Sequence, residues 1–318
     1  ALMNPIASLV LIRINGGTAM MRILGIVGVQ VCICVPIIVF QFCKGKEFFS
    51  KEYWGYALRI GIPIVPHYLS GIILNQGDRI MIDKMVGKTE VALYGLAYSI
   101  GMLVQLFISG MNSALTPWMY SKIKKGDIRS MRKVLQLLSI VVVGIAVALM
   151  LISPELVLIF GSPKYREAVY VIPPVAASVF FIFIYNILSM PQFYYEKTQF
   201  LMVASMAAAG ANVVLNFIFI RLFGYIAAGY TTLACYMLYS VGHYIVSKRI
   251  LVNEGIQENL MNPGFLLACS VFLIGASIIC NLIFPYRILR YAILLASAGL
   301  VFWKKELLLK TMADIRKK

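Results

Sequence analysis

The sequence predicts an all-α protein, a polytopic bundle of membrane helices with about nine spans. Its composition is the first indication: hydrophobic residues make up 61% of the 318 residues and charged residues only 13%. About a quarter of the residues in a typical soluble domain are charged. The second indication is the arrangement of the apolar residues in runs of about 17–25, the length that a helix needs to cross a hydrocarbon core of about 30 Å. Short polar turns separate these runs and leave no room for a soluble domain.

Nine apolar runs are taken as spans, although the last is short. They cover residues 19–42, 56–87, 93–118, 134–151, 168–190, 200–220, 225–246, 265–283 and 288–303. The run at residues 1–12 is too short to cross a membrane, and we interpret it as the end of a helix whose start precedes Ala1. No basic n-region or cleavage site follows Ala1, so no signal peptide is expected. The tail at residues 304–318 allows at most one surface helix.

Basic residues set the expected orientation. Lys and Arg number 29 against 13 Asp and Glu. Over alternate loops, eighteen of them lie on the side of residues 121–133 and the C-terminal tail, and ten lie on the other side. Because basic loops stay in the cytoplasm, the sequence predicts a multi-pass plasma-membrane protein with a cytoplasmic C-terminus. Contact with anionic membrane lipids explains the excess charge better than nucleic acid does, so no nucleic-acid partner is expected.

The run at residues 56–87 has the length of a span but contains polar groups that are unfavourable in hydrocarbon. Wound at about 100° per residue, it places these groups on one half of a helix and Leu and Ile residues on the other. Pro63 and Pro66 are expected to kink this helix. The pattern predicts a helix that lines a polar cavity. Its candidate substrate-binding residues are Arg59, His67, Ser70, Asn75, Asp78 and Arg79.

Each candidate has a structural interpretation beside the functional one. Arg59 is either a phosphate-binding charge near the cytoplasmic mouth of the cavity or an arginine whose stem extends to the membrane surface. His67 is either a cargo ligand or a packed, hydrogen-bonded histidine. Four charges lie near the outer end of the helix, and we favour mutual ion pairs that fix this end. They are Asp78, Arg79, Asp83 and Lys84.

Other polar residues within apolar runs are expected to hydrogen-bond across helices, because facing lipid would be unfavourable. They are Asn112, Asn212 and Asn216. No Ser–His–acid pattern, P-loop or zinc motif is visible. We therefore expect a protein that is not an enzyme and that has no catalytic residue, metal site or cofactor. The six cysteines lie in or beside apolar runs and are interpreted as small hydrophobic residues.

Five segments together resemble one family, over residues 15–248. In chain order they read GIPIVPHYLSGIILNQGDRIMI, ALYGLAYSIGMLVQLF, NSALTPWMYSKI, LVLIFGSPKYREAVYVIPPVA and NVVLNFIFIRLFGYIAAGYTTLACY. They resemble polysaccharide biosynthesis proteins, the Wzx-like oligosaccharide-lipid flippases of the multidrug/oligosaccharidyl-lipid/polysaccharide (MOP) exporter superfamily. The resemblance implies twelve to fourteen helices in two lobes of six, around a central cavity that opens alternately to the two sides.

By this resemblance the chain contains the second lobe of such an exporter, and most of the first lobe is absent. Residues 1–50 would be the end of the N-terminal lobe and the loop between the lobes. Residues 51–250 would be the C-terminal six-helix lobe, which begins with the polar helix. Residues 251–318 would be two further helices and a basic cytoplasmic tail.

The resemblance implies a flippase that moves undecaprenyl-pyrophosphate-linked oligosaccharide units across the plasma membrane for O-antigen, capsule or exopolysaccharide synthesis. Arg59 and the polar face of its helix would hold the pyrophosphate and sugar. Membrane lipids, a polysaccharide polymerase and glycosyltransferases are the further partners implied. One alternative is a cation-coupled multidrug antiporter of the same superfamily, which is weaker because the acids in the spans lie near helix ends. Another is an integral membrane glycan polymerase or ligase. Such an enzyme would need a large outward loop, and the sequence has no such loop between its apolar runs.

Overall fold

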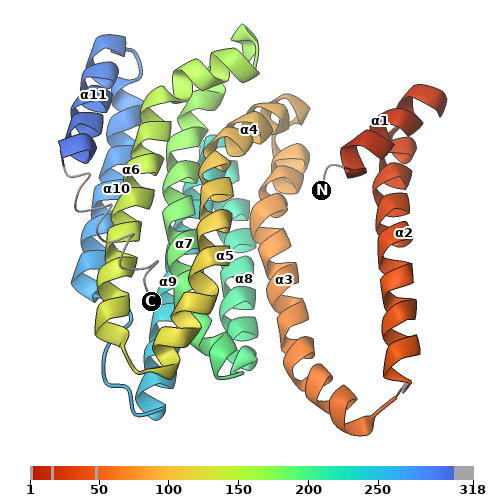
Figure 1. Ribbon diagram of the computed structural model, residues 1–318. Helices are drawn as coiled ribbons and strands as arrows, with labels where there is room; N and C mark the ends of the chain where they lie inside the picture. Colours follow the sequence, from red (N-terminus) through yellow and green to blue (C-terminus); the bar gives the residue numbers. More distant parts are fainter. Residues whose placement is uncertain (1–2, 16–17, 47–48, 304–318) are drawn as a thin grey trace. The chain divides into compact units, whose positions relative to one another are not determined.

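The computed structural model describes residues 3–15, 18–46 and 49–303 (Figure 1). Within these ranges the chain forms eleven α-helices, one 3₁₀ helix and no strand, which confirms the predicted all-α class. The chain divides into two compact units, Ala1–Arg59 and Ile60–Lys318.

The first unit contains two helices that pack on each other, α1 (Met3–Asn15) and α2 (Ala19–Gly45), and the start of α3 (Lys51–Met85). Close packing of α1 on α2 depends on Gly25, since a Cβ atom there would lie 2.6 Å from Ser8 Cα. The Ser8 hydroxyl also donates across the interface to the Arg22 carbonyl oxygen at 3.2 Å. Small residues thus let two apolar helices approach each other, as in many membrane proteins.

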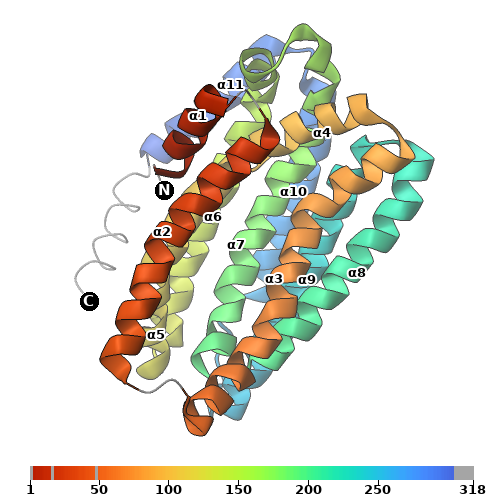
Figure 2. The same cartoon turned by 90° about the vertical axis from the view of Figure 1, so that its right-hand side faces the viewer.

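The second unit continues α3 from Ile60 and contains the other helices. In chain order these are α4 (Lys88–Gly101), α5 (Leu103–Lys124), α6 (Ile128–Phe160), η1 (Pro163–Val171), α7 (Ile172–Tyr194), α8 (Thr198–Phe223), α9 (Ile226–Asn253), α10 (Pro263–Ile283) and α11 (Arg287–Trp303). Figures 1 and 2 show α5 to α10 running roughly parallel to one another, with short connections. Gly224, at φ 75°, makes the tight turn from α8 to α9, a left-handed conformation that favours glycine.

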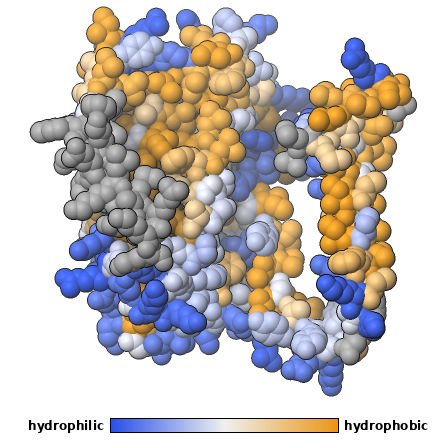
Figure 3. All heavy atoms as spheres, in the orientation of Figure 1, coloured by the Kyte–Doolittle hydropathy of each residue, from blue (hydrophilic) through white to orange (hydrophobic). Residues whose placement is uncertain are grey.

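Helix α7 forms the centre of the second unit. It packs against α5, α6, α9 and α10. Its side chains are buried along most of its length, and Phe180 and Phe183 are fully enclosed. A helix that is hydrophobic on all sides is expected at such a position. The surrounding helices expose apolar side chains on their outer faces. Figure 3 shows hydrophobic residues over much of the visible face of this unit, and hydrophilic residues at its lower end and at places along its upper edge.

Seven helical segments are long and apolar enough to cross a membrane, which confirms a multi-pass membrane bundle within the described residues. They are Met20–Gly45, Lys51–Met85, Lys88–Lys124, Ile128–Phe160, Pro163–Tyr194, Thr198–Phe223 and Pro263–Ile283. The other two expected spans correspond to α9, which carries many polar side chains, and to α11, which has 17 residues. The number of nine spans therefore stays a prediction.

The expected span at residues 93–118 is interrupted in the structure. Helix α4 ends at Gly101 and α5 begins at Leu103, with Met102 between them at ψ 0°. Gly101 lies so close to α7 that a Cβ atom there would be 2.6 Å from Val175 Cγ1. The interruption therefore lies where the chain approaches the central helix, a tertiary contact that the apolar run does not reveal.

In two other segments the structure fixes helix boundaries that the sequence did not define. Helix α3 continues through Pro63 and Pro66, so neither proline ends it. Helices α5 and α6 extend into the basic segment at 121–133 and leave only residues 125–127 between them. Lys122 is buried there, and its ammonium group lies 2.6 Å from the Asp127 carboxylate. The tail at residues 304–318 lies outside the described residues.

Candidate functional site

The polar side of α3 meets α4, α8 and α9 within the second unit. His67, Asn75 and Asp78 lie on this side and are hydrogen-bonded to side chains of those helices. The other side of α3 is apolar and exposed. Its exposed residues are Ile62, Val65, Leu69, Ile72, Ile73 and Ile80. The two sides follow from the helical repeat of about 100° per residue.

Asp78 is fully buried, and its carboxylate accepts three hydrogen bonds. The Tyr94 hydroxyl on α4 donates at 2.5 Å, Thr232 Oγ1 on α9 at 2.7 Å and Asn216 Nδ2 on α8 at 2.6 Å. A carboxylate without partners is strongly disfavoured in such surroundings, and each hydrogen bond to a charged group contributes about 1.5–3 kcal/mol. The three donors therefore make the burial of Asp78 possible and join α3 to three helices.

Further amides and hydroxyls orient the groups that donate to Asp78. Asn216 Nδ2 lies 3.2 Å from Asn212 Oδ1, and Asn212 Nδ2 lies 3.5 Å from the Thr232 hydroxyl. Thr231 donates to Asn216 Oδ1, which holds that amide with its nitrogen toward Asp78. We call these residues the Asp78 cluster: Asp78, Tyr94, Asn212, Asn216, Thr231 and Thr232.

The Asp78 cluster offers carboxylate, amide and hydroxyl oxygens in one buried place. A proton or a small hard cation would compete with the three donors for the carboxylate oxygens. Its binding would therefore weaken the hydrogen bonds that join α3 to α4, α8 and α9. In the described part of the chain, no group of three or more His, Cys, Asp or Glu side chains is placed to hold a metal ion.

A pocket of about 640 Å³ opens beside α3, one helical turn before Asp78. We call it the Asn75 pocket. Its lining combines tyrosine rings with amides, a hydroxyl and a guanidinium group: Tyr68, Gly71, Ile72, Asn75, Gln76, Arg79, Tyr98, Ser99, Met102 and Tyr185. Asn75 Oδ1 accepts hydrogen bonds from the Tyr98 hydroxyl at 2.8 Å and the Tyr236 hydroxyl at 3.3 Å. Asn75 is therefore held between α4 and α9.

Arg79 lies on the wall of the Asn75 pocket. Its guanidinium carbon is 5.2 Å from the centre of the Tyr98 ring, a cation–π contact. Its Nη1 donates to Gln76 Oε1 at 3.1 Å, and its Nε is buried and has no hydrogen-bond partner among the described residues. Arg79 therefore has hydrogen-bond donors that no group in the described part of the chain uses.

The sequence predicted mutual ion pairs at the end of α3, and this prediction is wrong. No ion pair joins any two of Asp78, Arg79, Asp83 and Lys84, all of which the structure describes. Asp83 and Lys84 are exposed. The reason is that Asp78 points between helices, where hydroxyl and amide donors satisfy it. Arg79 follows it by one residue and is therefore turned about 100° away.

Toward the start of α3, His67 joins a row of aromatic side chains on α9. Its Nδ1 lies 3.0 Å from the Tyr239 hydroxyl, and the Tyr239 ring packs on His243 with centroids 4.5 Å apart. His243 is fully buried, and its Nδ1 lies 2.8 Å from Gln192 Nε2 on α7. The Tyr185 ring packs on Tyr239 from α7, with centroids 4.5 Å apart. The row thus connects the two histidines of the chain through one tyrosine.

The other candidates from the sequence make few side-chain contacts. Ser70 is buried and donates to the Pro66 carbonyl oxygen at 2.7 Å, within α3 itself. Arg59 is the last residue of the first unit, is exposed, and makes no side-chain hydrogen bond or ion pair within the described residues. Asn112 is half-buried, and its Oδ1 has no hydrogen-bond partner there either. Asn212 and Asn216 thus connect helices, whereas Asn112 does not.

Sequence reasoning missed most of the residues that form the Asp78 cluster, the Asn75 pocket and the aromatic row. They are Tyr94, Tyr98, Tyr185, Gln192, Thr231, Thr232, Tyr236, Tyr239 and His243. A signal was present on α9, where Thr232, Tyr236, Tyr239 and His243 follow one another at intervals of four, three and four residues. This spacing places them on one face of a helix. A polar and aromatic stripe on a span indicates a face that meets other polar groups.

A family model described as polysaccharide biosynthesis protein matches residues 5–124. The matched range includes all of α3, with its polar side. The match confirms the resemblance of the sequence motifs at the level of this family. The last two of the five motifs lie beyond the matched range.

Two relatives from Haemophilus influenzae are similar to the chain. The Lsg locus putative protein 1 is 29% identical over 165 residues, which cover 48% of this chain and 40% of the relative. A protein described as an uncharacterized membrane protein is 29% identical over 191 residues, which cover 56% of this chain and 46% of the relative. The chain thus spans less than half the length of either relative. No solved structure matches the chain.

Proposed function

Residues 5–124 match the model of the polysaccharide biosynthesis protein family, and we propose that this chain is part of a flippase. Its cargo would be an oligosaccharide unit linked to undecaprenyl pyrophosphate, moved across the plasma membrane for surface polysaccharide synthesis. The second unit corresponds in this proposal to the C-terminal lobe, and the C-terminus is cytoplasmic. The protein would bind and move its cargo rather than transform it chemically.

The observation that carries the proposal is the Asn75 pocket, a polar hollow on a helix whose other side is apolar. Tyr68 and Tyr185 line this pocket and offer ring faces against which the apolar faces of sugar rings can pack. The Gln76 amide can donate to sugar hydroxyls, and its oxygen, which accepts one bond from Arg79, can accept another. Pockets with aromatic walls and a few fixed polar groups are typical of small-molecule binding sites. Because the exposed side of α3 is apolar, the lipid chain of the cargo could stay in the bilayer while the sugar occupies the pocket.

Arg79 is the proposed phosphate contact of the second unit. Its planar guanidinium group can bind two phosphate oxygens at once. Within the described residues the guanidinium group donates one hydrogen bond, from Nη1 to Gln76, which leaves terminal N–H donors for such a ligand. Arg59 stays a proposed phosphate contact of the first unit, where its side chain is exposed.

Complementation of a strain that lacks its own flippase tests this function. The full-length protein should restore surface polysaccharide, and Arg79→Ala and Gln76→Ala should reduce it while both variants reach the membrane at normal levels. Asp83→Ala is the matched control, since Asp83 is exposed on the same helix and does not line the pocket. Full restoration by the combined Arg79→Ala and Gln76→Ala variant at native expression would exclude the pocket as a cargo site.

A cation-coupled antiporter of the same superfamily is the second candidate, and one observation favours it. The sequence argument placed the acids of the spans near helix ends, but Asp78 is fully buried and bonded to three other helices. Reversible binding of a proton or small cation there would change how firmly α3 is held. Deletion of the gene separates the two functions: loss of surface polysaccharide supports the flippase. Increased drug sensitivity with unchanged polysaccharide, reproduced by Asp78→Asn, supports the antiporter.

A further inference from the structure

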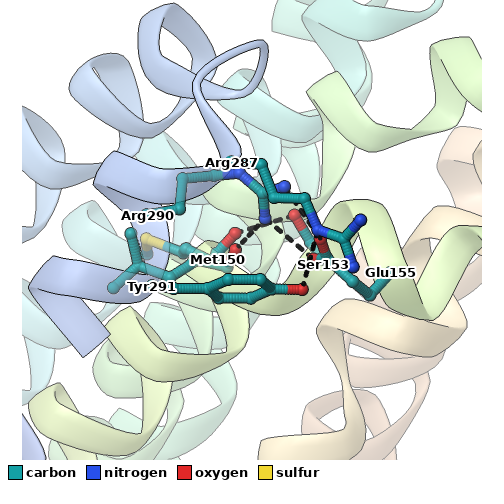
Figure 4. Close-up of polar contacts among 7 residues, drawn as sticks. Met150, Ser153, Glu155, Arg287, Arg290 and Tyr291 are labelled. Atoms are coloured by element: carbon teal, nitrogen blue, oxygen red, sulfur yellow. Dashed lines mark hydrogen bonds and ion pairs between the residues drawn. The ribbon is translucent and has the colours of Figure 1, made fainter. Parts of the chain in front are cut away.

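A second charged pocket, of about 630 Å³, is formed by the end of α6, by η1 and by the turn between α10 and α11. Five charged side chains line it: Glu155, Arg166, Glu167, Arg287 and Arg290. Figure 4 shows Glu155, Arg287 and Arg290 pointing toward one another beside Tyr291. We call this hollow the Arg287 pocket. It shares no residue with the Asn75 pocket.

Arg290 and Glu155 form the fixed part of the Arg287 pocket. Arg290 donates to both carboxylate oxygens, from Nη1 at 2.7 Å and from Nη2 at 2.8 Å. Its Nη1 also donates to the Leu151 carbonyl oxygen at 2.6 Å, and only 3% of its side chain is exposed. Such a two-pronged pair holds its geometry firmly. Glu155 therefore pairs with Arg290 and joins α11 to α6, while Arg290 Nε is buried and has no partner in the part of the chain that the structure describes.

Arg287 receives little of this negative charge. Its Nε lies 4.0 Å from Glu155 Oε1, an oxygen that Arg290 already uses, and 72% of its side chain is exposed. Arg166 is also exposed, and it forms no ion pair within the described ranges. Arg287 and Arg290 lie in the first turn of α11, where the helix dipole is already positive. The pocket is lined by three arginines and two glutamates, so its side chains carry a net charge of +1.

Apolar side chains flank the charged pocket on α6 and α11. They are exposed and comprise Leu158, Ile159, Phe160, Ile288 and Leu289. A basic hollow beside exposed apolar side chains, at the ends of membrane helices, fits the boundary between lipid chains and lipid headgroups. A free anion would leave these side chains uncovered, whereas the chains of a lipid would cover them.

We propose that the Arg287 pocket binds a phosphate group that belongs to the headgroup of an anionic phospholipid. Arg287 and Arg166 are its charged contacts, and the Arg290–Glu155 pair holds α11 in position for them. The chains of the lipid lie along the exposed apolar residues of α6 and α11. The site is independent of the proposed cargo pocket, so it stands whether the protein is a flippase or an antiporter.

Native mass spectrometry of the purified full-length protein in detergent tests the proposal. Phosphatidylglycerol is the probe, monogalactosyl diacylglycerol is a lipid without phosphate, and inorganic phosphate is a phosphate without lipid. Arg287→Ala should weaken phosphatidylglycerol binding about tenfold, the effect of losing one hydrogen bond to a charged group. Arg287 is exposed, so this variant should fold. Lys164→Ala is the matched control, because Lys164 is an exposed basic residue of η1 that does not line the pocket.

The expected result is binding of phosphatidylglycerol that depends on Arg287, does not depend on Lys164 and resists millimolar inorganic phosphate. Three results would overturn the proposal. Equal binding by wild type and Arg287→Ala would exclude the pocket. Equal, Arg287-dependent binding of the galactolipid would exclude the phosphate. Displacement of the lipid by inorganic phosphate, with the same dependence on Arg287, would assign the site to a free anion.

Discussion

The Tyr94 hydroxyl on α4 donates a 2.5 Å hydrogen bond to the carboxylate of Asp78 on α3, and both side chains are fully buried. The bond joins the helix that carries the polar face to the helix that precedes the interruption at Met102. Because no cationic side chain of the described residues pairs with Asp78, its burial depends on neutral donors from three helices. The stability of α3 in the second unit is therefore tied to the donors that face it.

Removing the Tyr94 hydroxyl should destabilise the protein. Tyr94→Phe leaves the ring in place and deprives a buried carboxylate of one donor, so the free energy of unfolding should fall by about 1–3 kcal/mol. Thermal unfolding in detergent measures the change. Tyr68→Phe is the control, because the Tyr68 side chain is 65% exposed and its hydroxyl makes no hydrogen bond within the described residues. Equal stability of Tyr94→Phe and the wild type would show that the bond contributes nothing.

Gly101→Ala should destabilise the protein because α4 approaches α7 closely at this point. The added Cβ atom would lie 2.6 Å from Val175 Cγ1, and such overpacking costs about 1–3 kcal/mol. Gly95→Ala on the same helix has open space around its Cβ atom and should be neutral or stabilising by up to about 1 kcal/mol. Unfolding midpoints of the two variants provide the comparison. Similar midpoints would contradict the close packing.

His243 and Gln192 should show coupled effects on stability. His243→Leu or Gln192→Leu alone leaves the other side chain of a buried 2.8 Å pair without its partner, which costs about 1–3 kcal/mol. The double variant leaves no unpaired partner and should lose less stability than the sum of the single variants. A double-mutant cycle by thermal unfolding measures this coupling. Strictly additive losses would mean that the two side chains do not interact.

Helix α6 separates Lys125 from Lys164, and both residues are exposed. With 33 residues, α6 is about 50 Å long, enough to cross a membrane. In the full-length protein without its natural cysteines, a cysteine at position 125 should resist impermeant thiol reagents in intact cells. A cysteine at position 164 should react. The opposite labelling pattern would show that the predicted cytoplasmic location of the C-terminus is wrong.

The fold class could be predicted from the sequence because apolar run length is a strong signal in membranes. The runs at 200–220 and 265–283 lie within α8 and α10. The interruption at Met102 could not be predicted, because it lies at the contact of Gly101 with Val175, more than seventy residues away in the chain.

The polar side of α3 could be predicted for a similar reason: the helical repeat alone groups His67, Asn75 and Asp78. What these residues bind could not. Sequence proximity suggested that Asp78 pairs with Arg79 or Lys84, whereas its partners lie 16 to 154 residues away. A local charge pattern cannot show that neutral donors from other helices will surround a carboxylate.

Cross-linking of the cargo tests the central proposal most directly. A photoreactive amino acid at Gln76, on the wall of the Asn75 pocket, is compared with one at Asp83 in cells that make lipid-linked oligosaccharide. Light should produce an oligosaccharide adduct at position 76 but not at 83, and deletion of the first glycosyltransferase should abolish it. No adduct at position 76, or an adduct that persists without the oligosaccharide, would contradict the assignment of this pocket to the cargo.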